Sequence, residues 1–599
     1  MNDKIDITLQ KKYTDKEIIL RTLKYIKPVL AKFILGLVLI LINVLLNVIA
    51  PRIMGDFMSR LDAKYLSQGS FESIIFFVVC YFLIIVANMI LTYIQTAIIQ
   101  TAGQSVIFTL RQQVFEKIES FSHDQLSAIP VGRLVTRVTN DTNSLNELYT
   151  TVLVNLLKQF LTLIGILISM VLINPILTGY MLIFMVAIVI VTVIFRHFSK
   201  IAFSEERKQV SNLNTFLSEN LYGIKITQIF NQEQRKKGEF DETNKAMVRA
   251  KRMVMYAFAI YRPTISFLYY LAIAVVFFVG FPMLDKEYIF FDRLFDFGML
   301  FAFYTYTDRF FGPIQNIAEQ FNRLQSGLVA SERIFNILDM EPSIKNKKEP
   351  LKIDTFKGKI EFKNVYFAYE DDDYILKDVS FIINPGQTVA FVGATGAGKT
   401  TILSLIVRNY DIQKGQILID DIDIKDIDLE CLRSKIGQML QDVFLFTGTI
   451  KDNIVLDNEK ISDEELNDAI KYVNADKFIN KLPDKLQTLV NEKGNNFSSG
   501  QRQLISFART VVSKPQILIL DEATANIDTE TEMLIQDSLE KMKNIGTMLI
   551  VAHRLSTIQH ADNIICLYHG EIIEQGNHQE LLKKKGYYYK LYLLQFENR

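Results

Sequence analysis

A glycine-rich loop that ends in a lysine and two threonines is the strongest chemical signal in this sequence. GATGAGKT, Gly393 to Thr400, follows the β-type run TVAFVG and precedes the helical run TILSLIVRNY. Strand, glycine loop and helix form the context in which GxxxxGK[ST] binds phosphates, because backbone N–H groups and the helix dipole face the anion. We predict a nucleotide site with Lys399 at the β- and γ-phosphates and the Thr400 hydroxyl on Mg²⁺.

A second predicted strand, ILILDEAT, ends in two acids that fit the same chemistry. Asp521 lies at the strand end, where its carboxylate is placed to hold Mg²⁺ through water. Glu522 is the predicted general base that polarises the attacking water. Two solvated acids after a buried strand are the alternative, which the phosphate loop about 120 residues upstream disfavours.

Length and composition limit what kind of protein carries this loop. A chain of 599 residues is too long for one core, so two or more domains are expected. Its formal net charge is zero, which argues against a basic nucleic-acid binder. The cysteines at positions 80, 431 and 566 are too far apart in sequence for a metal or disulfide spacing.

The first half of the chain carries long apolar runs, and a membrane span needs about 20 such residues. We predict six spans, of which the last is the weakest because Asp296, Asp308 and Arg309 interrupt it. The predicted spans cover residues 33–51, 74–94, 153–173, 177–195, 265–284 and 294–312. Buried helices of a large soluble domain are the alternative, which six runs in one half of the chain disfavour.

The connections between the spans predict an orientation. Spans three and four are joined only by Asn174-Pro175-Ile176, whereas the connections after spans two and four are long and rich in Lys and Arg. The positive-inside rule makes the long, basic side cytoplasmic, together with both termini. The long connections keep helical apolar spacing, so we expect helices that continue out of the membrane.

Several polar and aromatic side chains in the spans leave two interpretations open. Lys158 lies near a span end, where it can reach the interface. Asp308 and Arg309 lie deeper, and either line a substrate cavity or satisfy each other and neighbouring helices. The aromatic residues either line that cavity or pack: Tyr261, Phe267, Tyr269, Tyr270, Phe303, Tyr304 and Tyr306.

The order of motifs after residue 320 resembles one family, the ATP-binding cassette (ABC) exporters. The motifs are VYFAY, the phosphate loop, MLQDVFLF, FSSGQRQ, LILDEAT, NID and VAHRLST. The segments 121–141 and 218–233 resemble the family's cytoplasmic loops that dock onto the ATPase. The resemblance implies a half-transporter: an all-α transmembrane domain of six helices with long cytoplasmic extensions (1–335), a linker (336–355) and an α/β P-loop ABC ATPase domain (356–599).

The resemblance also implies roles for individual residues. Tyr369 resembles the aromatic residue that stacks on adenine, although a structural Tyr in a strand is the alternative. Gln441 resembles the glutamine that touches Mg²⁺ and the attacking water, His553 the switch histidine at the γ-phosphate, and Asp528 the D-loop aspartate. The implied nucleotide-binding set also includes Gly393, Thr395, Gly396, Gly398, Lys399, Thr400, Thr401 and Asp521. The implied Mg²⁺ ligands are Thr400, Gln441 and Asp521.

The segment NNFSSGQRQ departs from the family's signature, which usually reads LSGGQ and binds the ATP of the opposite subunit. Ser498, Gly500 and Gln501 match, whereas Phe497 replaces a Leu and Ser499 replaces a Gly. A Ser side chain crowds a backbone that must approach phosphate closely. Neutral drift in a homodimer is one interpretation. The one we favour is a heterodimer in which this chain gives Glu522 to the good site and its weak signature to the poor one.

The resemblance implies an ATP-driven exporter in the cell membrane that moves an amphipathic drug, lipid or peptide outward. Two rival functions stay open. One is a membrane ATPase that regulates a partner without transport, for which the ATPase activity is insensitive to amphipathic compounds. The other is a homodimeric lipid flippase, whose activity lipids stimulate in this chain alone.

Overall fold

The chain folds into two compact units. The computed structural model describes residues 13–60, 71–291, 293–370, 373–439, 442–456, 458, 460–521, 529–551 and 558–597. One unit, called the helical unit below, comprises Met1–Glu119 and Val131–Met340. The other, the α/β unit, comprises Ser120–Pro130 and Glu341–Arg599. The short segment Ser120–Pro130 therefore belongs to the α/β unit, although helical-unit residues flank it on both sides.

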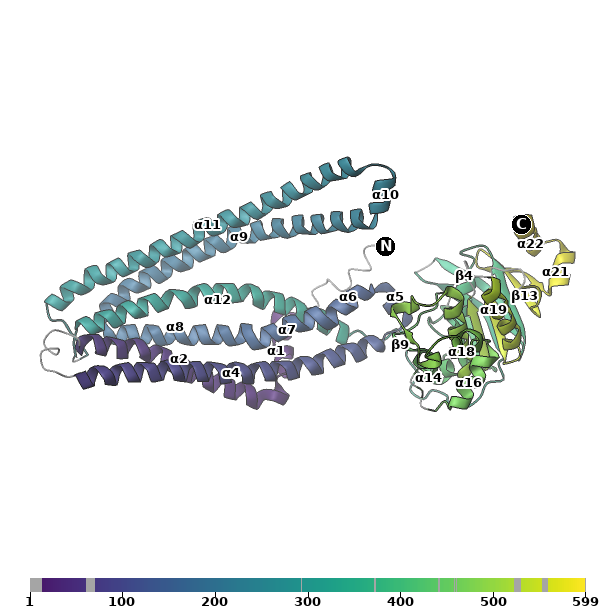
Figure 1. Cartoon of the computed structure of the whole chain (residues 1–599), viewed down its shortest axis with the longest axis horizontal. Coiled ribbons are helices and arrows are strands. Elements are labelled where there is room, and N and C mark those ends of the chain that lie inside the picture. Colours follow the sequence, from purple (N-terminus) through teal and green to yellow (C-terminus); the bar gives the residue numbers. More distant parts are fainter. Residues whose placement is uncertain are drawn as a thin grey trace. The chain divides into compact units, whose positions relative to one another are not determined.

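The helical unit is built from long helices (Figure 1). Its helices are α1 (Asp15–Lys24), η2 (Lys27–Val29), α2 (Leu30–Arg60), α4 (Phe71–Glu119), α6 (Val131–Thr136), η3 (Arg137–Asp141), α7 (Thr142–Glu147), η4 (Leu148–Val152), α8 (Leu153–Ile173), α9 (Pro175–Tyr222), α10 (Ile224–Ile229), α11 (Glu233–Asp285) and α12 (Phe297–Leu338). The strands β1 (Ile289–Phe290) and β2 (Arg293–Leu294) form a small antiparallel pair before α12. The segments η3 and η4 are π-helical turns.

Five of the described helical stretches are long and apolar enough to cross a membrane. They are Lys27–Ser59, Ile75–Glu119, Val131–Ile173, Pro175–Tyr222 and Glu233–Asp285. Each contains one of the first five predicted spans, apart from Ile74 at the edge of the second, so a multi-pass arrangement is confirmed. The sixth predicted span overlaps β2 and α12, and α12 does not meet the same criterion because charged residues interrupt its apolar run. A count of six spans therefore stays a prediction.

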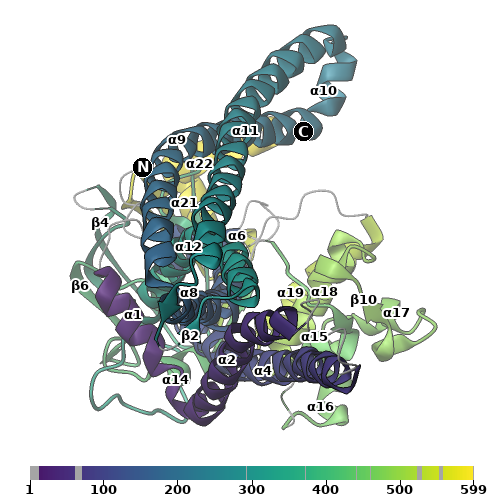
Figure 2. The same cartoon turned by 90° about the vertical axis from the view of Figure 1, so that its left-hand side faces the viewer.

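The spanning helices continue well beyond a bilayer, as their sequence spacing predicts. At 1.5 Å per residue, the 48 residues of α9 extend about 72 Å. The hydrocarbon core of a bilayer is about 30 Å thick. Helices α9 and α11 pack along each other as an antiparallel pair closed by α10, and the pair leans away from α2, α4 and α8 (Figures 1 and 2).

The tight turn between α8 and α9 follows from two adjacent residues. Asn174 has φ −156° and ψ 105°, the extended conformation favoured before proline. Its buried side chain accepts hydrogen bonds from the backbone N–H groups of Ile176 and Leu177, each at 3.0 Å. Pro175 starts α9, where a missing N–H costs nothing. The Asn-Pro pair thus ends one long helix and starts the next without an intervening loop.

The charged residues of the predicted sixth span bind neighbouring helices. Pro51 lies inside α2 and supplies no N–H for the carbonyl of Asn47, four residues earlier. The Arg309 guanidinium of α12 donates to that carbonyl at 2.9 Å, and the Tyr306 hydroxyl donates to the next carbonyl, that of Val48. In an apolar layer an unpaired carbonyl is costly, so α12 stabilises the proline-bearing turn of α2.

Asp308 has a different neighbour. Its carboxylate accepts a hydrogen bond from the Tyr269 hydroxyl of α11 at 2.7 Å. Of the aromatic residues with two open interpretations, Phe303 and Tyr306 are buried in packing, whereas Phe267 and Tyr270 are exposed. Phe303 and Tyr306 therefore pack, whereas both interpretations stay open for Asp308, which is exposed, and for Arg309, which is partly buried.

The α/β unit carries a mostly parallel sheet and an antiparallel sheet. The parallel sheet has the strand order β14-β13-β5-β12-β11-β8, and the antiparallel sheet has the order β4-β3-β6-β7. Their bounds are β3 (Ile360–Ala368), β4 (Tyr374–Ile383), β5 (Thr388–Gly393), β6 (Lys414–Ile419), β7 (Ile422–Asp423), β8 (Ile436–Met439), β11 (Ile517–Asp521), β12 (Thr547–Val551), β13 (Asn563–Tyr568) and β14 (Glu571–Gly576). A separate short pair joins β9 (Gly448–Thr449) to β10 (Leu489–Val490).

Helices complete the α/β unit around two hydrophobic cores. They are α5 (His123–Ala128), α13 (Lys399–Ile406), α14 (Leu429–Ser434), α15 (Ile450–Val455), α16 (Asp463–Tyr472), α17 (Asp476–Ile479), η5 (Lys485–Gln487), η6 (Glu492–Gly494), α18 (Ser499–Val512), α19 (Thr529–Met542), α21 (His578–Lys584) and α22 (Tyr587–Glu597). One core joins the parallel sheet to α16 and α18, and the other joins it to α13 and the antiparallel sheet. Every described residue of β5 from Thr388 to Val392 is buried, as expected for a central parallel strand.

We expect Arg309→Met to destabilise the helical unit, and we expect the size of this effect to depend on Pro51. Removing the guanidinium leaves the Asn47 carbonyl without its donor, which costs about 1–3 kcal/mol for a buried group. In a Pro51→Ala background, the backbone N–H restored by the alanine supplies that bond, so the same substitution costs less. The two substitutions form a double-mutant cycle. The temperature midpoint of unfolding in detergent, monitored by size-exclusion chromatography of a fluorescent fusion, measures the cost of Arg309→Met in each background.

Arg323→Met is the matched control, because Arg323 lies on the same helix and forms an exposed ion pair with Glu147. Such pairs contribute about 0–1 kcal/mol. If Arg309→Met lowers the unfolding midpoint equally in the parent and in Pro51→Ala, the proposed link to Pro51 is contradicted.

Candidate functional site: the phosphate loop and its surroundings

The glycine loop adopts the curled backbone that its sequence predicts. Gly396 has φ 83° and Gly398 has φ 99°, both in the left-handed region that favours glycine. The Ala397 N–H donates to the Ala394 carbonyl at 3.1 Å and closes the turn. A Cβ on Gly398 would lie 2.6 Å from Leu376 Cδ2, so this position also needs glycine for space. The loop leads directly into α13, whose first residue is Lys399.

Lys399 is buried but keeps its ammonium group at the loop. Its Nζ donates to the carbonyls of Gly393 at 2.9 Å and Ala394 at 3.0 Å. Burial lowers the pKa of Lys399, and the charge of Asp521 opposes that shift. A buried cation that donates to neutral carbonyls beside a single described carboxylate is favourable to an anion. The site therefore fits phosphate oxygens beside Lys399, with the exposed residues Thr395, Gly396 and Thr400 around the opening.

The parallel sheet brings the second acidic motif to the same edge. Asp521 of β11 pairs in register with Val551 of β12, and Val551 pairs with Phe391 of β5. Three parallel strands thus end together, with the phosphate loop after β5 and Asp521 at the end of β11. This is the arrangement that a magnesium-nucleotide site requires, because the carboxylate lies at the edge where the phosphates lie.

Four predicted catalytic or coupling residues fall outside the described residues: Gln441, Glu522, Asp528 and His553. Their sequence positions follow strand ends at this edge. β8 ends at Met439, β11 at Asp521 and β12 at Val551. Their roles stay predictions.

Tyr369 lies just after β3 with half of its surface exposed. Its hydroxyl lies 3.1 Å from Thr401 Oγ1 on the phosphate-loop helix. The ring meets Tyr410 edge-on, with the centroids 5.1 Å apart, and it meets Phe367 at 4.9 Å. An exposed flat ring fixed to the phosphate-loop helix is suited to stack on a base.

Two supporting residues near Tyr369 were not found from the sequence. The Gln413 side chain brackets the backbone before Tyr369, accepting from Ala368 N–H at 3.0 Å and donating to its carbonyl at 2.8 Å. Burial raises the pKa of the Tyr410 phenol, whose ring packs on Tyr369. Tyr410 is the last residue of the predicted helical run TILSLIVRNY, but nothing in the sequence spacing indicates that it contacts residue 369.

The segment Ser120–Pro130 packs beside this aromatic pair. The His123 ring of α5 meets Tyr410 edge-on at 5.7 Å. Ser122 Oγ accepts from the Ile344 N–H at 3.0 Å, and Gln125 Nε2 donates to the Glu341 carbonyl at 2.8 Å. The chain of ring contacts His123–Tyr410–Tyr369 therefore joins α5 to the predicted adenine platform within the α/β unit.

The signature segment forms a well-capped helix start. Ser498 is the N-cap of α18, and its Oγ accepts from the Gln501 N–H at 3.2 Å. The Gln501 side chain returns a bond to the Ser498 N–H at 3.0 Å, which completes a capping box. Phe497 is buried and packs against Phe478, so its replacement of Leu is absorbed by the core. Ser499 is partly buried at the first helical turn, and Gly500 is buried.

A partly buried arginine, Arg509, joins this helix to the loop that follows residue 441. Arg509 of α18 donates from Nε to the Asn453 carbonyl at 2.7 Å and from NH1 to the Phe444 carbonyl at 3.1 Å. Asn453 in turn accepts from the Phe446 N–H and donates to its carbonyl, each at 2.8 Å. These hydrogen bonds fix the signature helix to the 444–453 segment.

Comparisons with known proteins agree with this geometry. Residues 33–314 match the family described as ABC transporter transmembrane region, and residues 376–525 match the family described as ABC transporter. A putative ABC transporter ATP-binding protein, exp8 of Streptococcus pneumoniae, is 37% identical over 98% of this chain and 99% of its own length. A probable multidrug resistance ABC transporter ATP-binding/permease protein, YheH of Bacillus subtilis, is 37% identical over 88% of this chain and 78% of its own.

A solved structure shares the fold. The structure of a bacterial Atm1-family ABC exporter with ATP bound covers 94% of this chain and 98% of its own, with a TM-score of 0.76 and 25% identity. The chain belongs to the ABC transporter family. It is an ABC exporter with a multi-pass helical membrane region and an ATPase domain that binds ATP.

We expect Tyr410→Ala to raise the KM for ATP about 2- to 12-fold while kcat changes less than twofold. An aromatic pair contributes about 0.5–1.5 kcal/mol, and this pair orients the ring of Tyr369, which is predicted to stack on the base. Tyr410→Phe keeps the ring and should stay close to the parent. Steady-state ATPase assays on the purified assembly test both variants. A KM unchanged in Tyr410→Ala contradicts a positioning role for this ring.

Proposed function

We propose that the chain is one half-transporter of a heterodimeric exporter. ATP binding and hydrolysis drive outward movement of an amphipathic drug, lipid or peptide across the cell membrane. One observation supports coupling between the ATP site and the membrane helices. Helix α5 lies between α4 and α6 in the chain, yet its residues are fixed in the α/β unit beside Tyr410 and Tyr369. A change at the base site is thereby transmitted to a segment that is covalently continuous with two membrane helices.

The chemistry is assigned to residues at the carboxyl edge of the parallel sheet. Lys399 binds the β- and γ-phosphates, and Thr400 with Asp521 and Gln441 holds Mg²⁺, which neutralises charge on the phosphates. Glu522 polarises the attacking water, and His553 contacts the γ-phosphate. The in-register ends of β5, β12 and β11 support this assignment, because they bring the loop and Asp521 together.

A second subunit is needed to complete each site. In the proposed assembly Ser498, Ser499, Gly500 and Gln501 face the ATP held by the partner, and Asp528 lies at the same interface. The exposed cap of α18 supports this, because the N-terminal end of a helix favours phosphate. The apolar side chains exposed around α10, among them Tyr222, Ile226 and Ile229, support a docking role for the 218–233 loop on the partner.

We favour a heterodimer because the signature of this chain departs from the family pattern, whereas its phosphate loop and acidic motif do not. The Phe497 side chain is buried in the core, so the remaining departure within the signature is Ser499, whose Cβ and hydroxyl narrow the approach to phosphate. Residues assigned to this chain's own site keep the family pattern. Six spans, cytoplasmic termini, and domains at 1–335 and 356–599 joined by the linker 336–355 complete the proposal.

Native mass spectrometry of the chain purified from its own membranes in mild detergent is the first test. We expect the mass of this chain plus a second, different chain of similar size. A mass equal to twice this chain contradicts the heterodimer and makes FSSGQ a working variant.

Substitutions in the assembly separate the two kinds of ATP site. We expect Glu522→Gln to lower steady-state ATP hydrolysis by about 10²-fold or more, because it removes the general base of the good site. Ser499→Gly should change kcat less than twofold, because this signature faces the poor site. A large rise in kcat for Ser499→Gly indicates that the signature serves a working site and argues for a homodimer.

Transport separates the exporter from its rivals. In inverted vesicles, the exporter accumulates an amphipathic dye in an ATP-dependent and Lys399-dependent manner. ATPase activity without dye or lipid movement favours a membrane ATPase that regulates a partner. Lipid movement by this chain alone favours the homodimeric flippase.

A further inference from the structure

The chain passes between its two units three times: before and after the segment Ser120–Pro130, and after Met340. The first two passages flank α5, and the third precedes residues 341–347, called the linker strap below. Within the α/β unit, α5 and the linker strap both contact one short turn, residues 408–411, which follows the phosphate-loop helix α13. This turn therefore contacts both segments through which the α/β unit is covalently joined to the helical unit.

Arg408 begins this turn in an unusual backbone conformation. Helix α13 ends at Ile406 with Val407 as its C-cap, and Arg408 follows with φ 52°, in the left-handed region where glycine is usual after a helix. Its side chain is nevertheless almost fully buried, with 3% of its surface exposed. A non-glycine residue in this region persists only where its surroundings fix it, and such residues cluster at functional sites. The contacts of the Arg408 side chain are therefore the feature to explain.

The Arg408 guanidinium donates hydrogen bonds to three separate segments. Its Nε donates to the Asp411 carboxylate at 2.9 Å, within the turn. Its NH1 donates to the Ile424 carbonyl, just after β7, at 3.4 Å. Its NH2 donates to the Lys345 carbonyl of the linker strap at 3.2 Å. Because the guanidinium is a rigid planar fork, a displacement of the turn moves all three donors together.

The linker strap is held on both sides of this contact. Before Lys345, the Ser343 hydroxyl donates to the Asp124 carboxylate of α5 at 2.7 Å. After it, Asn346 Oδ1 accepts from the N–H of Leu429, the first residue of α14, at 3.0 Å. The bond from Arg408 lies between these two attachments, so the strap is an ordered segment of the α/β unit at the point where Arg408 binds it.

The other end of α13 lies at the phosphate loop. The helix begins at Lys399, and its eight residues extend about 12 Å. Its apolar side chains, among them Ile402 and Ile406, are buried in the core shared with both sheets. Close-packed interiors are stiff and transmit strain, so we expect a displacement at Lys399 to appear at Arg408 as well.

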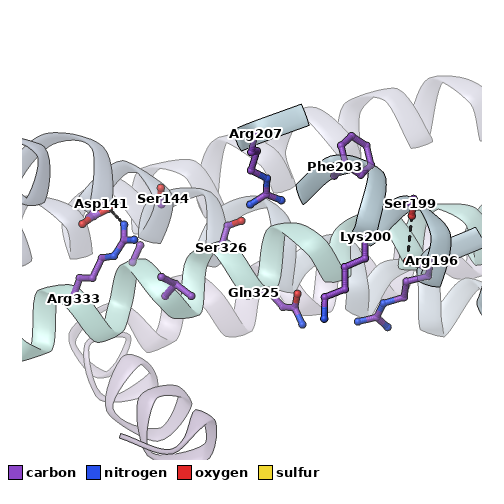
Figure 3. Close-up of a pocket in the computed structure, with 12 residues that line it drawn as sticks. Asp141, Ser144, Arg196, Ser199, Lys200, Phe203, Arg207, Gln325, Ser326 and Arg333 are labelled. Atoms are coloured by element: carbon purple, nitrogen blue, oxygen red, sulfur yellow. Dashed lines mark hydrogen bonds and ion pairs between the residues drawn. The ribbon is translucent and has the colours of Figure 1, made fainter. Parts of the chain in front are cut away.

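The helix that precedes the linker strap in the chain lines a cavity of the helical unit. This cavity has a volume of about 710 Å³, and residues of η3, α7, α9 and α12 line it. Figure 3 shows Ser326 and Arg333 of α12 beside it, with Arg333 joined to Asp141 of η3 at 3.6 Å. Helix α12 ends seven residues before Lys345. The strap that Arg408 binds is therefore covalently continuous with a wall of this cavity.

We propose that Arg408 is a positioning residue for transport, an inference that rests on the proposed export function. When nucleotide orders the phosphate loop at the start of α13, Arg408 beyond its end holds the linker strap in the matching position. Nucleotide occupancy then reaches α12 through Arg408, as it reaches α4 and α6 through Tyr410 and α5. Because Arg408 lies at the opposite end of α13 from the phosphate loop, its loss uncouples transport from hydrolysis and leaves hydrolysis itself in place.

Amide hydrogen exchange of the purified full assembly in nanodiscs tests the link directly. In the parent, we expect Mg²⁺ with adenylyl imidodiphosphate to slow exchange in peptides from 341–347 at least about threefold. In Arg408→Met, which removes all three donors, we expect the same nucleotide to slow exchange there less than about 1.5-fold. Peptides from 393–401 are the internal control, because nucleotide should slow their exchange equally in both proteins.

Arg433→Met is the matched control variant. Arg433 of α14 donates to the carbonyls of Val407 at 3.3 Å and Arg408 at 3.1 Å, so it supports the same helix end. Among the described residues, it forms no hydrogen bond with the linker strap. We therefore expect Arg433→Met to keep the nucleotide-dependent slowing at 341–347.

The amount of amphipathic dye moved per ATP hydrolysed in inverted vesicles gives a second measurement. Arg408→Met should lower this ratio at least about fivefold, while the KM for ATP and the kcat of hydrolysis stay within about twofold. Arg433→Met should leave the ratio close to that of the parent. Arg408→Lys keeps the buried charge without the planar fork, so it replaces Arg408→Met if that variant does not assemble, with a smaller loss in the same direction.

Failure of this inference is distinguishable from failure of the export function. Equal nucleotide-dependent slowing at 341–347 in the parent and in Arg408→Met overturns the role of Arg408 and leaves the exporter standing. An equal loss of that slowing in Arg433→Met also overturns it, because the effect then comes from a loosened helix end. ATP hydrolysis without dye movement in the parent overturns export, whereas the exchange measurement still decides whether Arg408 joins the nucleotide site to the linker strap.

Discussion

The register of three parallel strands is the constraint on which the nucleotide site depends. Phe391, Val551 and Asp521 pair across β5, β12 and β11, so the phosphate loop and the acidic strand end at one edge. A slip of one residue would turn each strand's side chains to the opposite face and shift its end relative to its neighbours. The buried apolar residues on both faces of these strands oppose such a slip. Core packing therefore fixes the distance between Lys399 and Asp521, although neither residue belongs to the core cluster.

The sequence predicted what depends on local pattern. The loop around Lys399 and the strand before Asp521 were recognisable because strand, glycine and helix follow each other in the chain. Five spans were recognisable because apolar length alone indicates them. The aromatic contacts of Tyr410 and His123 were not, since residues 123 and 410 meet only in the folded unit. The sixth span stays a prediction because Asp308 and Arg309 reduce the signal that apolar length would give.

The polar contacts in the helical unit show why that last signal is weak. Pro51 removes a backbone donor from α2, and Arg309 supplies one from α12, so the two departures from an apolar pattern are complementary. Alone, either Pro51 or Arg309 would be unfavourable in a membrane helix. Together they specify which turn of α12 lies against which turn of α2, because a shift of one turn, about 5.4 Å, would separate the guanidinium from the Asn47 carbonyl. Side-chain polarity thus sets the relative height of two helices that apolar packing alone would leave free to slide.

The membership of α5 in the α/β unit bears on how the chain is made. Ser122 bonds to Ile344, which is synthesised 222 residues later. At about 5–20 residues per second, the ribosome needs roughly 10–45 s to deliver that partner, and longer to complete the sheet beneath Tyr410. During this interval α4 and α6 flank a segment without its docking surface. Maturation therefore ends with a capture step, in which the last-made part of the chain closes on one of the first. When synthesis stops before residue 341, the segment Ser120–Pro130 lacks its docking surface. It then stays exposed in the unfinished chain and is accessible to quality-control proteases.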